Sequence, residues 1–124
     1  MIRHRLSAAN FDEDDEGAID PNKPLYVALY GDRTKKSGYA KLSLKENVKK
    51  SPTVETLVWK DASISGLTTA EDSAIFAMVE ERTEDSPDLF VGKNFRKMKQ
   101  LTKTNPFQKN FLWGRSELIN YQNR

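Results

Sequence analysis

The chain has 124 residues and no cysteine; 37% of its residues are hydrophobic and 31% are charged. This length favours one domain with a modest core, and the lack of cysteine excludes disulfides, thiolate metal sites and cysteine nucleophiles. No run approaches the ~20 apolar residues of a membrane-spanning helix, and the first residues lack the apolar stretch of a signal peptide. We therefore expect an intracellular protein, cytoplasmic or nuclear, that has no membrane span and is not secreted.

Charged residues fall into four blocks of alternating sign. The formal net charge is −3 over residues 1–24, +5 over residues 25–50, −7 over residues 51–92 and +7 over residues 93–124. The whole chain carries only +2. The two basic blocks nevertheless make one strongly positive surface if the fold brings them together.

Residues 1–24 are predicted to form a flexible acidic arm, and residues 25–124 a single domain. Five consecutive acids at residues 12–16, followed by glycine and prolines, leave no apolar face whose burial would offset the entropy lost on ordering. The spacing of these acids partly matches a calcium-binding loop, but Lys23 stands where that loop needs a bidentate glutamate. The sequence therefore predicts no metal site here.

Residues 25–44 are predicted to form a β-hairpin, with residues 54–59 as a third strand of the same small antiparallel sheet. The first half of the hairpin is rich in β-branched and aromatic residues and ends at Gly31. The second half alternates, which places Ala40 and the leucines inward and Lys41 outward. A cationic hairpin turn either protects a sheet edge or contacts phosphates. The cations of this turn are Arg33, Lys35 and Lys36.

Residues 70–82 are predicted to form a helix. Thr68 and Glu71 have the spacing of a capping box, in which each side chain satisfies a free amide at the start of a helix. The apolar run at residues 74–79 also suits a buried strand, because periodicity does not separate the two structures for so short a run. The capping box favours the helix.

Residues 88–103 are predicted to form a second helix, which makes the expected fold class α+β. Ser86 and the proline after it suit a helix start, and Pro106 follows the helix end. Apolar residues recur at helical spacing on one stripe, with cations on the opposite side. The stripe consists of Val91, Phe95, Met98 and Leu101.

Five acids near the end of the first predicted helix resemble a carboxylate metal site. No histidine lies near them, and they fall at a helix end and a turn. A solvated acidic surface is therefore the better interpretation. These acids are Glu80, Glu81, Glu84, Asp85 and Asp88.

Residues 107–114 are predicted to form a C-terminal aromatic strand or an extended segment that wraps the domain. Large aromatic side chains usually contribute to a core, so we expect at least one of the three in this segment to be buried. The three are Phe107, Phe111 and Trp113.

The sequence predicts no catalytic residue, no cofactor and no metal site. His4 is the only histidine and lies in an N-terminus that is expected to fray, so neither a histidine-based triad nor a zinc site is expected. No Gly-x-Ser-x-Gly motif is present. Gly92 and Lys93 lack the first glycine and the hydroxyl residue that complete a phosphate-binding loop. We therefore predict that the protein is not an enzyme.

Two functions fit these features. The first is a nucleic-acid-binding module for single-stranded DNA or RNA, because cations neutralise phosphates and rings stack on bases. The second is a protein-interaction module, such as an adaptor, an inhibitor or an assembly subunit, whose interface is the C-terminal aromatic and basic segment. The partner is therefore nucleic acid or another protein. The predicted nucleic-acid-binding residues are Arg33, Lys35, Lys36, Lys93, Arg96, Lys99, Lys103, Lys109, Arg115, Phe107, Phe111 and Trp113.

Overall fold

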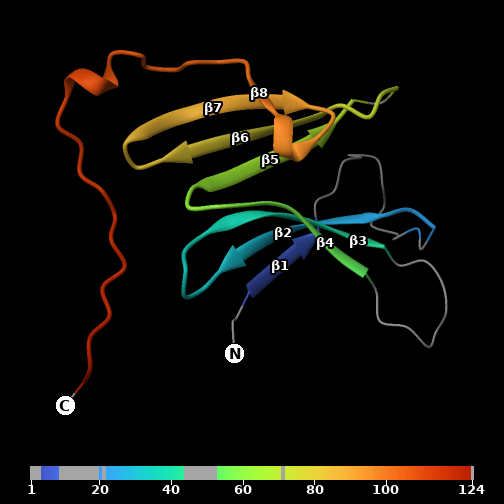
Figure 1. Cartoon of the computed structure of the whole chain (residues 1–124), viewed down its shortest axis with the longest axis horizontal. Helices are drawn as coiled ribbons and strands as arrows, with labels where there is room; N and C mark the ends of the chain where they lie inside the picture. Colours follow the sequence, from blue (N-terminus) through green and yellow to red (C-terminus); the bar gives the residue numbers. More distant parts are fainter. Residues whose placement is uncertain (1–3, 9–19, 21, 44–52, 71, 124) are drawn as a thin grey trace.

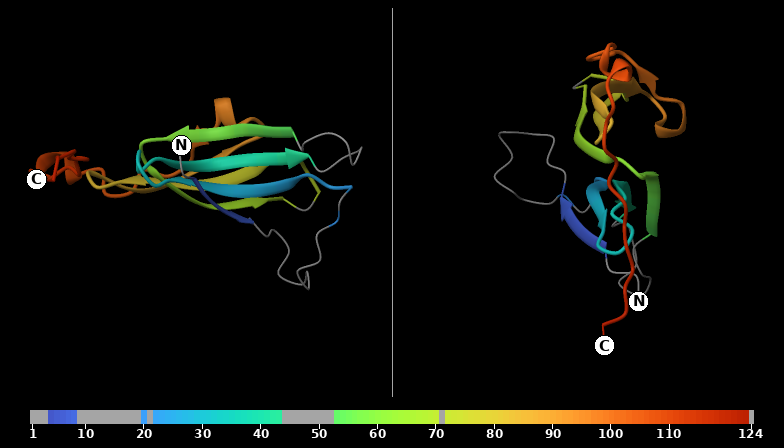
Figure 2. Two further views of the ribbon diagram at one scale, coloured as in Figure 1. Left: turned by 90° about the horizontal axis from the view of Figure 1, so that it is seen from below. Right: turned by 90° about the vertical axis from the view of Figure 1, so that its left-hand side faces the viewer.

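The structure is a computed structural model that describes residues 4–8, 20, 22–43, 53–70 and 72–123. These residues form two four-stranded antiparallel sheets and two short 3-10 helices (Figure 1). Within each sheet the strands lie in chain order. The end-on view in Figure 2 shows the two sheets as separate layers, one above the other.

The chain completes the first sheet before it begins the second. The first sheet contains β1 (His4–Ala8), β2 (Leu25–Gly31), β3 (Ser37–Ser43) and β4 (Thr53–Lys60). The second contains β5 (Ser63–Thr69), β6 (Phe76–Arg82), β7 (Asp85–Gly92) and β8 (Lys99–Gln100). The 3-10 helices are η1 (Phe95–Lys97) and η2 (Gln108–Asn110).

The predicted α+β fold class is wrong, because the described residues contain no α-helix. Residues 70–82, predicted as a helix, instead cover the connection after β5 and the whole of β6. β6 pairs with β7 across the turn at Thr83 and Glu84. Residues 76–79 of the apolar run therefore belong to a strand, which is the alternative that this run also allowed. No helix among the residues that the structure describes is long and apolar enough to cross a membrane.

Residues 88–103, predicted as the second helix, form most of β7, then η1 and β8. The chain leaves β7 at Gly92, where an added Cβ would lie 3.2 Å from the Cα of Met98. This close approach lets the chain turn back on itself and return along β7. Phe95 and Met98 still pack against the core as the apolar stripe requires, but Leu101 is exposed.

Strands do occupy the predicted hairpin and third strand, but with their faces reversed. Tyr26 and Ala28 of β2 pack against the core between the sheets, and their cross-strand partners are Lys41 and Tyr39. Lys41 therefore points to the side of the second sheet, whereas Ala40 lies on the opposite side. The prediction that Lys41 faces outward and Ala40 inward was wrong. We call the side of Ala40 the far face of the first sheet.

The N-terminal region is described only in part. His4–Ala8, which the sequence placed inside the acidic arm, forms β1 and pairs with β2. The acids at residues 12–16 lie outside the described residues, so the acidic arm and the calcium-loop comparison stay predictions.

The core lies between the two sheets and is small. Its buried members come from β3, β4, β5, β6 and the connection between the sheets: Tyr39, Val58, Ala62, Ile64, Leu67 and Met78. Half-buried rings and side chains from β2, β6, β7 and the loop around η1 surround it.

Side chains of β3 also join the two sheets by hydrogen bonds. The Ser37 hydroxyl accepts from the Ile64 amide and donates to the Ala62 carbonyl, both at 2.7 Å. The Tyr39 hydroxyl accepts from the Leu67 amide at 3.3 Å. These contacts satisfy backbone groups along the outer edge of β5, where a further strand would otherwise have to pair.

No strand follows β8 in the described residues up to position 123. Beyond Gln100 the chain follows β7, forms η2 and then runs as an extended segment past the end of both sheets (Figures 1 and 2). Neither predicted form describes residues 107–114 as a whole, because Gln108–Asn110 form η2 and the chain runs extended only after it.

Candidate functional site

A groove lies where the loop after β7 meets β4. Its volume is about 240 Å³, and its walls come from β2, β3, β4, β6 and the loop that contains η1. The groove therefore opens between the two sheets and draws on both halves of the chain. The residues that matter for its chemistry are Tyr26, Lys41, Glu55, Phe76, Lys93 and Arg96.

Three half-buried rings form the aromatic wall of the groove. The ring of Phe76 lies between those of Tyr26 and Phe95, with centroid distances of 5.6 and 4.8 Å. All three rings are tilted against one another and pack on the core. Burial, and then the charge of Glu55, raise the pKa of the Tyr26 hydroxyl. The wall therefore presents a neutral phenol.

Three cations from two separate parts of the chain meet at this groove. Lys41 comes from β3, in the early basic block, and Lys93 and Arg96 come from the loop around η1, in the late one. The side chain of Asn94 holds this loop, because it accepts from the Arg96 amide at 2.9 Å. Glu55 lines the same groove and carries the opposite charge. The groove thus has an excess of positive charge beside aromatic rings.

From the groove, a line of exposed cations follows the chain along the edge of the second sheet. We call it the basic ridge; its members are Lys93, Arg96, Lys97, Lys99, Lys103 and Lys109. The sequence has no carboxylate between residues 93 and 116. In the part of the chain that the structure describes, no ridge cation is in an ion pair. The ridge is therefore a row of exposed cations without ion-pair partners among these residues, although the carboxylates of Asp85 and Asp88 bind other side chains of the same segment.

A buried carboxylate, Asp88, holds the ridge against β7. Asp88 is only 4% exposed, and its oxygens accept hydrogen bonds from Gln100, Thr102 and Thr104 at 2.7 to 3.0 Å. The backbone amide of Thr104 is the main cause of a lowered pKa of Asp88, and the side-chain bonds add to it. We call this arrangement the Asp88 clamp. Farther along, the Gln108 side chain donates to the Asp85 carboxylate and accepts from the amide and hydroxyl of Ser86.

These contacts correct the expected solvated acidic surface. Glu80 and Asp88 are buried, and Glu80 accepts from Lys60 at 2.5 Å and from Arg82 at 2.7 Å. Glu81, Glu84 and Asp85 keep more solvent exposure. Within the described ranges, no group of three or more acids and histidines is arranged to hold a metal ion.

The predicted aromatic residues gather at the far end of the ridge, around η2. Phe107, Phe111 and Trp113 are 57%, 64% and 51% exposed, so the expectation that at least one is buried in the core was wrong. The rings of Phe107 and Phe111 meet edge to face at 6.5 Å. The Trp113 indole nitrogen donates to the Gln108 carbonyl at 2.7 Å. This cluster presents ring surface to solvent beside Lys109.

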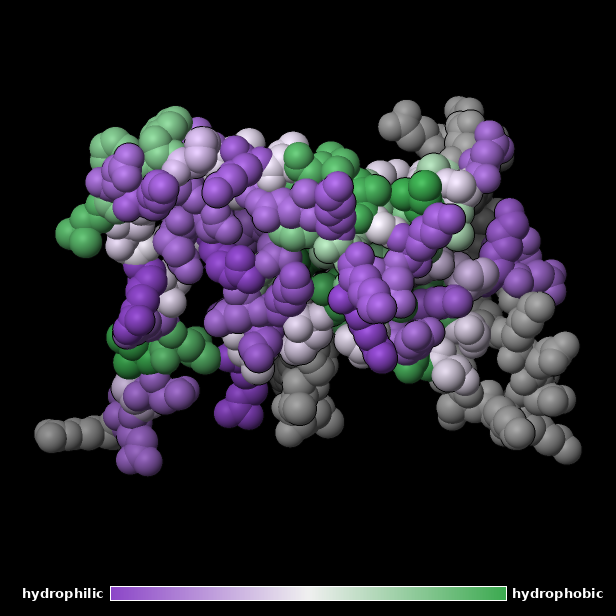
Figure 3. Space-filling view, turned by 45° about the horizontal axis from the view of Figure 1, so that its top comes forward, coloured by the Kyte–Doolittle hydropathy of each residue, from purple (hydrophilic) through white to green (hydrophobic). Residues whose placement is uncertain are grey.

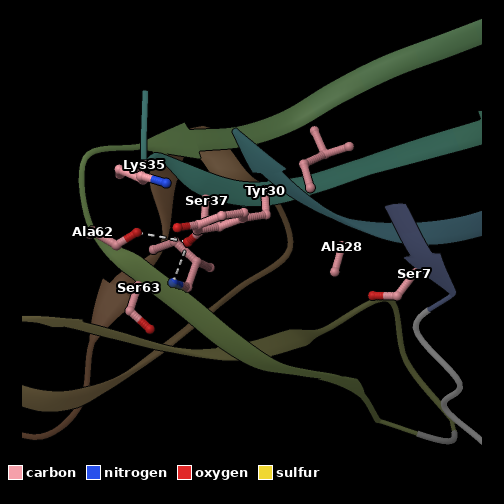
Figure 4. A pocket seen from close by; sticks show the side chains of 9 residues that line it. Ser7, Ala28, Tyr30, Lys35, Ser37, Ala62 and Ser63 are labelled. Carbon is pink, nitrogen blue, oxygen red and sulfur yellow. Dashed lines mark hydrogen bonds between the residues drawn. The ribbon is translucent and has the colours of Figure 1, made fainter. Parts of the chain in front are cut away.

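The cations of the β2–β3 turn do not join the ridge. Lys35 lines a hollow of about 580 Å³ with Tyr30, Ser37 and Ser63, as Figure 4 shows. It also borders a second hollow, together with Glu81, Glu84 and Arg115, where charges of both signs meet. Arg115 forms an ion pair with Glu117. Lys35 and Arg115 thus lie apart from the cations of the groove, and Arg33 and Lys36 belong to the same turn as Lys35.

Sequence reasoning missed Lys41, Tyr26 and Phe76 as groove residues. The pairing of Tyr26 with Lys41 across β2 and β3 would have placed them on one face. Phe76 was hidden by the helix prediction for its segment.

Comparison of the chain with protein families, with curated proteins and with solved structures finds no match.

Proposed function

We propose that this protein binds single-stranded nucleic acid along the basic ridge and its groove, and that it is a binding module with no catalytic activity. The observation that carries the proposal is the ridge itself: six exposed cations with no carboxylate between them in the sequence. A row of exposed cations that form no ion pairs can neutralise phosphates, and the release of the salt ions condensed on the phosphate backbone favours binding.

The groove extends this surface. Lys41 adds a cation from the first sheet to Lys93 and Arg96. A single-stranded nucleic acid that lies along the ridge reaches the groove at one end and the aromatic cluster around η2 at the other. Phosphates bind to the cations between these two points.

The aromatic cluster favours single strands over duplexes. Phe107, Phe111 and Trp113 are exposed individual rings rather than parts of a helix or strand that fits a groove of a duplex. A base stacks on such a ring only when it is unpaired and turned out, and stacking of this kind contributes about 1–3 kcal/mol per base.

The alternative function, a protein-interaction module, uses the C-terminal part of the same segment. One observation favours it: Leu112, Leu118, Ile119 and Tyr121 are all exposed. Apolar side chains exposed on an extended segment are typical of an interface element that is covered by a partner. This function and nucleic-acid binding use different side chains, so one chain can have both.

The test of the first proposal is a fluorescence polarisation titration with a labelled single-stranded oligonucleotide at two salt concentrations. We expect binding at low salt that weakens linearly in the logarithm of the salt concentration. A duplex of the same sequence should bind more weakly. Absence of binding to the single strand at low salt would overturn the proposal.

Two double variants with the same change in charge locate the site. Lys93→Ala with Arg96→Ala removes two cations at the groove and should lower affinity by about tenfold or more. Arg33→Ala with Lys36→Ala removes two cations at the β2–β3 turn and should leave affinity nearly unchanged. Equal losses in both variants would show that binding follows net charge and not the ridge.

A further inference from the structure

The groove is open toward solvent and closed at its inner end. Its floor is a row of cross-strand partners on the side of the first sheet opposite the far face: Tyr26, Lys41 and Glu55. The loop that contains η1 forms the other wall. Phe76, in ring contact with Tyr26 and Phe95, closes the inner end, because these rings pack against the core. A nucleic-acid backbone that enters the groove therefore cannot pass through it.

The charge of the groove exceeds the charge that one internal phosphate would neutralise. Lys41, Lys93 and Arg96 each carry one positive charge. Glu55 is the one carboxylate among the lining residues, which leaves a net formal charge of +2. A phosphodiester inside a strand carries one negative charge, whereas a phosphate monoester carries about −1.5 to −2 at pH 7. Burial, and then the charge of Glu55, raise the pKa of Tyr26, so its phenol adds no negative charge. The groove therefore matches a terminal phosphate in charge.

Neutral hydrogen-bond donors line the same groove. The side-chain oxygen of Asn94 accepts from the Arg96 amide at 2.9 Å, so the NH₂ group of this side chain is a donor for a ligand. Thr56 adds an exposed hydroxyl. A terminal phosphate presents three acceptor oxygens, one more than the two unesterified oxygens of a phosphodiester. The groove thus supplies donors as well as positive charge for a terminal phosphate.

The size and position of the groove also suit the end of a strand. Its volume of about 240 Å³ is below the roughly 300–1,000 Å³ of pockets that hold drug-sized molecules, so it admits a small terminal group. The ridge reaches the groove at Lys93. On the other side, β4 carries Glu55 and no cation before Lys60, which is paired with Glu80. β4 therefore offers no row of cations that would lead a backbone onward.

We propose that the groove recognises a free end of a single-stranded nucleic acid by binding its terminal phosphate monoester. This inference rests on the proposed function, because the rest of the strand lies along the ridge. Lys41 contacts the phosphate from the floor of the groove, and Lys93 and Arg96 contact it from the opposite wall. The face of the molecule in Figure 3 is largely hydrophilic, and its exposed hydrophobic side chains form smaller, separate groups. A charged end group suits such a surface better than an apolar ligand.

The first test compares oligonucleotides that differ only in their end groups. Unlabelled single strands with hydroxyl groups at both ends, with a 5′-phosphate or with a 3′-phosphate compete against an internally labelled strand in a polarisation assay. We expect one of the two phosphorylated ends to raise affinity by about tenfold, as one hydrogen bond to a charged group would. Equal gains at both ends would reflect added charge alone and would overturn the proposal, as would no gain at either end.

A methyl ester of the favoured end phosphate separates a monoester from a diester. The ester keeps the phosphate in place but has one negative charge and one unesterified oxygen fewer. Its affinity should fall to nearly that of the strand with hydroxyl ends. An affinity equal to that of the free phosphate would contradict the recognition of a monoester.

Substitutions then locate the bound phosphate. Lys41→Ala and Arg96→Ala should each bring the affinity for the phosphorylated strand close to that for the hydroxyl-ended strand. Lys103→Ala with Lys109→Ala removes two cations of the ridge outside the groove, so it should weaken both strands and keep their affinity ratio. A ratio that survives in either groove variant, or that is lost in the ridge variant, would place the phosphate elsewhere and overturn the proposal.

The same assay separates this inference from the proposed function. Binding of the hydroxyl-ended strand at low salt depends on the ridge and not on a terminal phosphate. If this strand binds and neither end phosphate adds affinity, the proposed function stands and end recognition fails. If no strand binds, whatever its ends, the proposed function fails and this inference fails with it.

Discussion

Thr104 binds one carboxylate oxygen of Asp88 through two groups: its backbone amide lies 2.8 Å from that oxygen and its hydroxyl 3.0 Å. Asp88 belongs to β7, and Thr104 follows β8 by only a few residues. The regular pairing of β7 with β8 ends early, so side chains take over the role of the backbone ladder from this point. One buried carboxylate thus holds the chain that carries the basic ridge.

Asp88→Asn should release this part of the chain. The substitution removes the charge that strengthens the hydrogen bonds and places an amide NH₂ group among donors. We expect faster hydrogen exchange of the Thr102 and Thr104 amides, while the exchange of core amides in β6 stays slow. Asp85→Asn is the matched control, because Asp85 accepts one bond from Gln108 and is more exposed. Equal acceleration in both variants would contradict a special role for Asp88.

The Asp88 clamp should also make the free energy of unfolding depend on pH in the acidic range. The pKa of Asp88 lies below its ordinary value of 3.8 in the folded protein, chiefly because of the Thr104 amide. The folded state therefore binds this proton more weakly than the unfolded state. The contribution is complete above pH 3.8 and is lost as the pH falls below that value through the lowered pKa. Urea unfolding at a series of pH values should show it, and the loss should be smaller in Asp88→Asn.

Local sequence patterns were sufficient for the hairpin strands but misleading for the second half of the chain. β2 and β4 are rich in β-branched and aromatic residues, so local preference and final structure agree. The sequence indicated that side chains near Ser86 and Asp88 accept hydrogen bonds from free backbone amides, but it did not indicate which amides. Residues of this kind cap free amides at a helix start. Here Asp88 receives the amide of Thr104, which lies far along the sequence, and such a contact leaves no local signal.

The sequence predicted which kinds of residue make up the candidate site, but not where the fold places them. The late basic block does form one ridge, because most of its cations lie on a single segment along β7. The early block divides: Lys41 reaches the groove, whereas Lys35 lies with carboxylates at the other hollow. Register and sheet packing decide this division, and both are long-range properties that charge counting does not contain.

Ser37→Ala should destabilise the contact between the two sheets. The Ser37 hydroxyl accepts a hydrogen bond from the Ile64 amide and donates one to the Ala62 carbonyl, and Ile64 and Ala62 are both buried. Removing it leaves two backbone groups without that partner, which costs roughly 1–3 kcal/mol in the free energy of unfolding. Ser63→Ala, at an exposed position in the same region, should change stability by no more than about 0.5 kcal/mol. Similar urea midpoints for both variants would contradict the role given to Ser37.

Gly38→Ala should disturb the pairing of β3 with β4. An added Cβ would lie 1.9 Å from the Val58 carbonyl oxygen, a distance that forces the strands apart. We expect a loss of roughly 1–3 kcal/mol or more in the free energy of unfolding. Gly114→Ala is the control, since no atom lies within 4 Å of a Cβ added at that position. The thermal midpoint of this variant should match that of the unchanged chain. A stable Gly38→Ala protein would mean that β3 and β4 lie farther apart.

Lys41→Ala tests whether the groove belongs to the nucleic-acid surface. Lys41 is the cation that the first sheet adds to Lys93 and Arg96, and it lies next to the aromatic wall. If it neutralises one phosphate of a single strand, its loss should reduce the slope of log affinity against log salt by about 0.7. Lys36→Ala, at the β2–β3 turn, removes the same charge and should leave the slope unchanged. An unchanged slope in Lys41→Ala would confine the bound strand to the ridge, because a phosphate seated in the groove must lie within reach of this side chain.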